Sequence, residues 1–167
     1  MASSTDRAPA LAVTVALLAT TLSGCGNQRD EYCSTLRADT ATLARLASAS
    51  GRAHTDVLAR SQAVFTDLRQ KAPPDVAGDW ADFAGAWQHL VTAFRAAGME
   101  PDEFDPRQRP PGVSTGQFQA IRQAAAKLDS EPVRLAAARI EDHARVVCKV
   151  DLAGGLGAGA GPGGTAG

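Results

Sequence analysis

The chain has 167 residues, of which 44% are hydrophobic and 21% are charged, and its formal net charge at pH 7 is -1. This length suits one domain, and the hydrophobic content is too high for a wholly disordered chain. The near-neutral charge gives no basic field that would hold nucleic acid, and no apolar run suits a polytopic membrane protein.

The N-terminal segment, residues 1–24, is typical of a secretory signal peptide. Arg7 and the amino terminus supply positive charge, and the apolar stretch over residues 8–22 is too short to span a membrane comfortably. The stretch ends in Leu22-Ser23-Gly24-Cys25, which resembles the lipobox of bacterial lipoproteins. The resemblance implies transfer of diacylglycerol to the Cys25 thiol and cleavage between Gly24 and Cys25. The alternative is an ordinary cleaved signal, or an uncleaved anchor, with a free Cys25.

Acylation of Cys25 would make the membrane the first partner of this chain. Two or more acyl chains hold a protein on a bilayer stably, because each buried methylene contributes about 0.8 kcal/mol. We therefore expect residues 25–30 to form a lipidated tether on the extracytoplasmic face of the cell membrane, and residues 31–152 to fold outside the cytoplasm.

The other two cysteines, Cys33 and Cys148, lie near the two ends of the expected folded segment. Disulfides are permitted outside the cytoplasm, so we predict that these two residues form one. Closing a loop of roughly 100 residues contributes on the order of 4–5 kcal/mol in the chain-entropy model. Two buried, unpaired thiols are the alternative. No C-x-x-C motif or paired zinc-ligand motif is present, so we expect no redox catalysis, metal site or cofactor.

Residues 31–152 predict an all-α domain, because apolar residues recur at helical spacing and no segment alternates with period two. Helices are expected over about 30–49, 55–71, 76–97, 115–128 and 131–150. Asp75 is expected to cap the third helix and Gly98 to close it. Ser114 and Gln117 have capping-box spacing, and Pro132 marks a break within the last helix.

These elements predict a four-helix bundle whose last helix is broken near Pro132. Leu135 and His143 are expected to face inward from that helix, with His143 a hydrogen-bonded histidine of the core or its boundary. Residues 153–167 are rich in glycine and carry no charge, so a disordered tail is expected.

The third helix carries the clearest apolar stripe, which includes Trp80 and Trp87. Such a stripe is usually core. Loose packing beside the two tryptophans and the small residues Ala84 and Ala86 would instead admit a small or lipidic ligand, which makes Trp80 and Trp87 candidate ligand-binding residues.

Charged residues gather in three places, and a solvated surface is the favoured interpretation of each. An acid pair or metal site on the third helix, a weak cation site in the proline-rich loop over 99–112, and contact of the last helix with anionic lipid are the alternatives. The residues concerned are Asp75, Asp79 and Asp82; Glu100, Asp102, Glu103 and Asp105; and Arg134, Arg139, Arg145 and Lys149.

Over about residues 25–152 the chain resembles a group of uncharacterised small helical lipoproteins of GC-rich Gram-positive bacteria. The resemblance rests on Tyr32-Cys33, on Ala72-Pro73-Pro74-Asp75 followed by Asp79-Trp80, on Ala97-Gly98 before Pro101, and on Arg139-Ile140 and His143-Ala144 before Cys148. It implies a helical domain on the outer face of the membrane and implies no activity.

The chain contains no nucleotide-binding, serine-hydrolase or zinc-protease fingerprint. We therefore expect a non-catalytic module that binds another component of the cell envelope. A carrier of a small or lipidic ligand in the bundle core is the alternative, and a hydrolase that uses scattered acids is the least favoured.

Overall fold

The computed structural model describes residues 24–48, 55–152 and 156, and over these residues it is almost entirely helical. The elements in chain order are α1 (Gly24–Ser48), α2 (Thr55–Lys71), α3 (Pro74–Ala97), the short 3-10 helix η1 (Pro101–Glu103), α4 (Thr115–Leu128), α5 (Glu131–His143) and the π-helical turn η2 (Ala144–Cys148). The described part of the chain has no strand beyond one isolated bridge between Asp105 and Gln108. The all-α prediction is confirmed. The expected signal peptide up to residue 23, the residues beyond Ser48 that would end the first helix, and nearly all of the glycine-rich tail lie outside the described residues.

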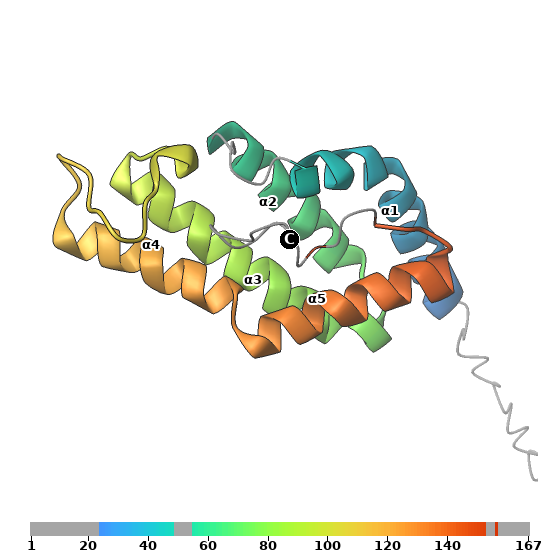
Figure 1. Ribbon diagram of the computed structural model, residues 1–167. Coiled ribbons are helices and arrows are strands. Elements are labelled where there is room, and N and C mark those ends of the chain that lie inside the picture. The colour runs from blue at the N-terminus through green and yellow to red at the C-terminus, as the bar shows by residue number, and fades with distance from the viewer. Residues whose placement is uncertain (1–23, 49–54, 153–155, 157–167) are drawn as a thin grey trace, which may run out of the picture.

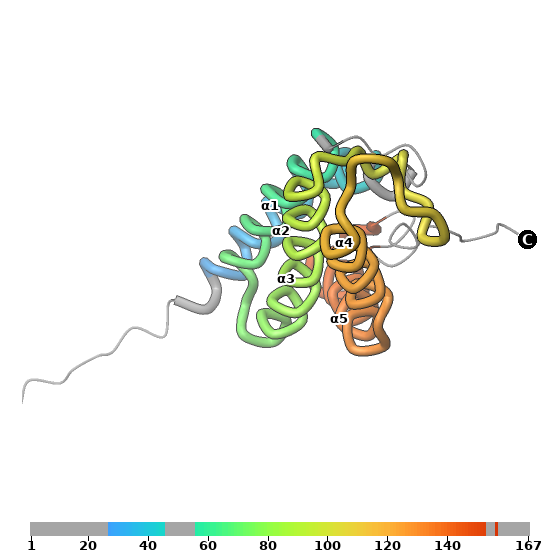
Figure 2. Tube along the Cα trace, turned by 90° about the vertical axis from the view of Figure 1, so that its left-hand side faces the viewer, coloured from blue at the N-terminus to red at the C-terminus, as the bar shows by residue number. Residues whose placement is uncertain are grey.

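The long helix α3 lies in the middle of the molecule. It packs against α2 on one side and against α4 and α5 on the other, while α1 packs on α2 and reaches η2 (Figure 1, Figure 2). Along α3, α4 lies beside the C-terminal half and α5 beside the N-terminal half (Figure 1). With 24 residues, α3 is about 36 Å long, so it sets the distance between the two ends of the fold.

Prolines set the corner between α2 and α3. The helix α2 ends at Lys71, and Pro74 is the first residue of α3, where its missing N–H costs no hydrogen bond. Pro73, with φ -67° and ψ 160°, is the N-cap residue. The expectation that Asp75 caps this helix is therefore wrong, and Asp75 instead lies in the first turn. The predicted C-cap is confirmed, because Gly98 takes the left-handed conformation with φ 60°.

The predicted break in the last helical segment is also present. Ser114 begins α4 with a complete capping box, in which the Gln117 N–H donates to Ser114 Oγ over 3.2 Å and the Ser114 N–H donates to Gln117 Oε1 over 2.9 Å. The helix ends at Leu128, and α5 begins at Glu131 with Pro132 in its first turn. The two helices therefore meet α3 separately.

Three expectations about helix ends and faces are corrected. The first helix begins at Gly24, about two turns earlier than expected, so residues 25–30 are helical. The last α-helix ends at His143, and the π-helical turn η2 leads to Lys149, whose φ is 56°. Leu135, expected to face inward, is 50% exposed. The face of α5 that packs inward carries mainly small and β-branched residues, which allow a close approach to α3: Val133, Ala136, Ala137 and Ile140.

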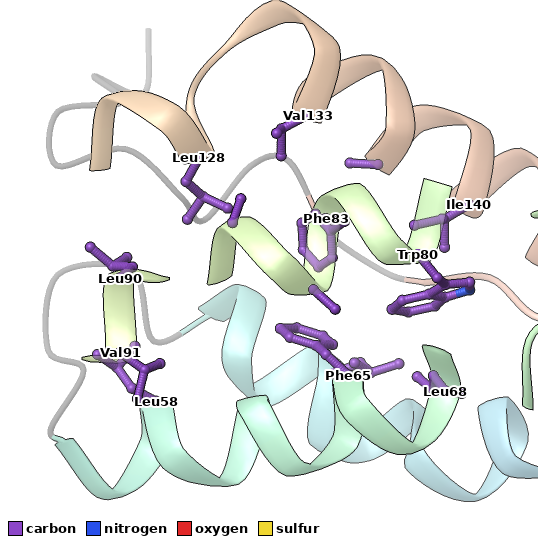
Figure 3. Packing of buried hydrophobic residues seen from close by; sticks show 14 of the residues in the cluster. Leu58, Phe65, Leu68, Trp80, Phe83, Leu90, Val91, Leu128, Val133 and Ile140 are labelled. Carbon is purple, nitrogen blue, oxygen red and sulfur yellow. The ribbon is translucent and has the colours of Figure 1, made fainter. Parts of the chain in front are cut away.

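The core is a layer of large side chains between α2, α3 and α5. Phe65 of α2 lies against Trp80 and Phe83 of α3, with ring centroids 6.2 and 5.0 Å away (Figure 3). The ring centroid of Trp87 is 5.2 Å from that of Phe65. Val133 and Ile140 of α5 cover the other side of α3 (Figure 3). Beyond η2, the side chains of Val150 and Leu152 are buried, and Leu156 packs against the same core. The segment after the last helix therefore adds to the core.

Candidate functional site

The first turns of α1 meet two other segments at one end of the molecule. We call this end, comprising residues 24–33, 70–76 and 143–149, the basal end. The side-chain amide of Gln28 donates to the backbone oxygen of Ala72 over 3.0 Å, and the guanidinium of Arg29 lies 3.6 Å from the carboxylate of Asp75. Cys25, the predicted acylation site, belongs to the first turn of α1, three residues before Gln28. The start of α1 is thereby fixed to the corner between α2 and α3.

The predicted disulfide joins α1 to η2 at this end. Cys33 and Cys148 are bonded across a sequence separation of 115, their Cα atoms are 5.0 Å apart, and both residues are buried. The guanidinium of Arg37 donates to the backbone oxygen of Cys148 over 3.0 Å, next to the bond. The pairing of Cys33 with Cys148 is confirmed in the structure.

A buried tyrosine connects α1 to the aromatic core. The indole N–H of Trp80 donates to the hydroxyl of Tyr32 over 2.8 Å, and both side chains are fully buried. Burial raises the pKa of Tyr32 to about 12, and the negative charge of Asp75 acts in the same direction, against the opposing effect of the hydrogen bond from Trp80. The phenol is therefore held in its neutral form.

His143 completes this buried group from α5. Its ring lies against Tyr32 with centroids 5.6 Å apart, and its Nε2 is 3.3 Å from Oδ2 of Asp75. The side chain is 10% exposed, so the predicted inward orientation is confirmed. The expected hydrogen bond is not confirmed, because neither ring nitrogen has a hydrogen-bond partner among the described residues. His143 therefore lies next to the carboxylate of Asp75 without a hydrogen bond to it.

The acidic face of α3 is engaged in pairs with other helices. Asp75 lies between Arg29 of α1 and His143 of α5, and Asp79 accepts from Arg139 of α5 over 2.7 Å. Asp82 is exposed. Of the three aspartates expected on one face, Asp75 and Asp79 thus contact basic residues of α1 and α5, and Asp82 lies at the surface. This arrangement positions helices.

The two tryptophans proposed as ligand contacts belong to the packed core. Trp80 is fully buried, and the half-buried Trp87 donates its indole N–H to the backbone oxygen of Leu58 over 3.4 Å. An open hollow of about 450 Å³ is lined by residues of α2 instead. Neither tryptophan borders it; its lining residues are Ala59, Gln62, Ala63, Thr66, Asp67 and Gln70.

The described residues hold neither a metal-ligand cluster nor a membrane-spanning helix. No group of three or more histidine, cysteine, aspartate or glutamate side chains is arranged to hold a metal ion within the described ranges. No helix in the same part of the chain is both long and apolar enough to cross a membrane.

Sequence reasoning missed the residues that dock the start of α1. Gln28 and Arg29 are polar and interrupt no apolar repeat, so helical periodicity carried no signal for them. The available signal was the absence of proline between Gly24 and Asp30, which permits a helix to continue through this segment.

Comparison of the chain with protein-family models, with curated proteins and with solved structures finds no match.

Proposed function

We propose that this chain is a lipoprotein held on the extracytoplasmic face of the cell membrane through an acylated Cys25, and that its helical domain binds another envelope component without catalysis. The observation that carries the proposal is the disulfide between Cys33 and Cys148. Structural disulfides persist in oxidising compartments outside the cytoplasm and are rare inside it. An exported chain with a lipobox-like sequence at residues 22–25 would use its remaining cysteine, Cys25, for the lipid.

We infer that the domain is a four-helix bundle in which α4 and α5 together take the place of one helix. Both pack along α3, one after the other, and Pro132 explains why they are separate helices. The segment beyond η2 supports this arrangement, because Val150 and Leu152 are buried in the same core.

Binding without catalysis is supported by how the aspartates of α3 are used. Asp75 and Asp79 pair with Arg29, His143 and Arg139, which connects α3 to α1 and α5. A general acid or base needs access to substrate, whereas both ring nitrogens of His143 are buried. The carrier alternative has less support, because Trp80 is fully buried among protein side chains.

The test is intact-mass analysis of the full chain expressed in a Gram-positive host and extracted from membranes. The expected product begins at Cys25, carries the diacylglyceryl group and lacks two hydrogen atoms because of the disulfide. The matched variant Cys25→Ser should leave the membrane fraction and keep the disulfide. An unacylated wild-type chain with free thiols at Cys33 and Cys148 would overturn the proposal.

Binding to an envelope component is tested in the same cells. A photo-reactive amino acid at Leu135, a large apolar side chain that is 50% exposed on α5, should give one discrete cross-linked species that disappears with Cys25→Ser. The same label at buried Leu68 is the control. The absence of a discrete product at Leu135 would contradict a binding role.

A further inference from the structure

The helix that carries the proposed lipid enters the folded body without an intervening linker. An α-helix rises 1.5 Å per residue, so Gln28 lies about 4.5 Å and Cys33 about 12 Å along the axis from Cys25. Gln28 already bonds to Ala72, and Cys33 is covalently tied to Cys148. The position of Cys25 relative to the domain is therefore set by helical geometry over less than one turn.

We propose that the basal end lies directly against the phospholipid headgroup layer, with the domain held in a fixed orientation and the loop between α3 and α4 pointing away from the membrane. This inference rests on the proposed acylation of Cys25. The glycerol group on that residue would sit at the depth of the headgroups, with its acyl chains in the hydrocarbon core. The residues that follow Cys25 in the first turns of α1 must then lie at the same surface.

The two ends of the fold are far apart, which makes the orientation measurable. We call residues 98–117, which comprise the loop between α3 and α4 and the start of α4, the distal end. Figure 1 shows the start of α1 and η2 at one end of α3 and this loop at the other. The length of α3 puts about 36 Å between them, several times the Debye length at physiological salt.

The exposed side chains of the basal end fit a headgroup layer of any charge. Arg29 and Asp75 are about half exposed and pair with each other, and exposed Arg145 pairs with Asp142. Val146 is 54% exposed and Lys149 is exposed beside it. Long basic side chains can reach phosphate groups while their stems cover apolar surface. The mixture of charges means that the acyl chains, and not anionic lipid, would hold the domain there.

Freeing the domain from this orientation would require unpacking the start of α1. The hydrogen bond from Gln28 to Ala72 and the ion pair between Arg29 and Asp75 would both have to break. A flexible tether needs no such step, so inserting one gives a matched control.

The experiment places a fluorophore at either end of the full-length acylated protein. Gln70 at the basal end and Gln108 at the distal end are both exposed glutamines, so Gln70→Cys and Gln108→Cys form a matched pair. The introduced thiol is the only free one when Cys25 is acylated and Cys33 is bonded to Cys148. The labelled proteins are incorporated into phosphatidylcholine vesicles that contain a headgroup-linked quencher. The Gln70 label should be quenched several-fold more than the Gln108 label.

A flexible Gly-Ser segment of about ten residues, inserted between Gly26 and Asn27, has a root-mean-square length of roughly 16–19 Å and should remove most of this difference. Equal quenching at the two positions in a chain with the acylated mass would overturn the orientation and leave the proposed function standing. A difference that survives the insertion would overturn the rigid coupling through α1. A chain without the acyl mass would overturn the proposed function and this inference together.

Discussion

The basal and distal ends of this molecule are held by different kinds of interaction. At the basal end, segments separated by 44 to 115 positions are joined by the Gln28–Ala72 and Tyr32–Trp80 hydrogen bonds and by the disulfide. At the distal end, Phe104 of the loop lies between Phe94 and Phe118, with centroids 5.7 and 5.8 Å away, and Ser114 caps α4. These distal partners lie within 24 positions of each other in sequence.

The difference indicates how each end would respond to damage. Loss of a basal contact releases a segment whose partner is remote in sequence, so the lost constraint acts on the whole chain. Loss of a distal contact affects a loop that both flanking helices still hold. We therefore expect the basal substitutions to have the larger effects on the free energy of unfolding.

The largest effect is expected from removing the disulfide. In a Cys25→Ser background, the double variant Cys33→Ala/Cys148→Ala should lose about 4–5 kcal/mol of unfolding free energy, because the unfolded chain regains the freedom that a loop of this length removes. Urea unfolding with and without reductant measures the loss. Reductant should shift the midpoint of the chain with both cysteines and leave that of the double variant unchanged; equal midpoints would contradict the prediction.

Trp80→Ala should cost about 3–5 kcal/mol, because the change leaves a cavity in the core and removes the hydrogen-bond donor to Tyr32. Trp87→Ala is the control, since Trp87 is only half-buried and makes a longer hydrogen bond. Chemical denaturation of the two variants compares the losses. If Trp87→Ala lowered the unfolding free energy as much as Trp80→Ala, burial of the side chain would not explain the size of the loss.

Tyr32 should make the fold sensitive to alkaline pH. Its pKa is about 12 in the folded chain and 10.0 in an unperturbed tyrosine, so the folded chain holds this proton more tightly. The contribution to stability is therefore complete below pH 10 and is lost as the pH rises from 10 to about 12, by about 2–3 kcal/mol.

Ultraviolet titration measures this directly, because Tyr32 is the only tyrosine in the chain. The tyrosinate band should develop near pH 12 in the folded protein. Tyr32→Phe should flatten the alkaline fall in unfolding free energy relative to the wild type, because it removes the group whose proton is held more tightly in the folded chain. A tyrosinate band that develops near pH 10 while the chain is still folded would contradict the burial of the phenol.

The smallest effect is expected at the distal end. Ser114→Ala should cost about 1 kcal/mol, because it removes the acceptor for the Gln117 N–H at the start of α4. Ser34→Ala is the control, since Ser34 is exposed within α1 and its hydroxyl makes no hydrogen bond among the described residues. Thermal and urea unfolding should separate the two variants, and equal losses would argue against the capping role.

Much of the fold could be predicted because local chemistry marks it. Pro73 and Pro74 end α2, Gly98 supplies the left-handed conformation after α3, and Ser114 with Gln117 caps α4. The disulfide partners could be paired because one of the three cysteines was assigned to the lipid. These features depend on residues close together in sequence or on a small number of candidates.

The rest depends on tertiary contacts that periodicity does not report. The segment before Asp30 is polar, and its helix is supported by contacts of Gln28 and Arg29 with a corner that forms more than 40 residues later. On α5, Leu135 and Ala136 are adjacent, and the smaller residue faces α3 because the helices approach closely there. Likewise, Tyr32, Asp75 and His143 come together only when α1, α3 and α5 have packed against one another.

The disulfide also turns most of the chain into a covalent ring. Cys33 and Cys148 enclose every helix from α2 to α5, including the exposed proline-rich loop after Gly98. A protease that cuts this loop once would leave a nicked molecule with both pieces still linked. Such a cut would be invisible on a non-reducing gel, and only reduction would reveal two fragments, so the molecule could survive a single break in its surface without losing either half.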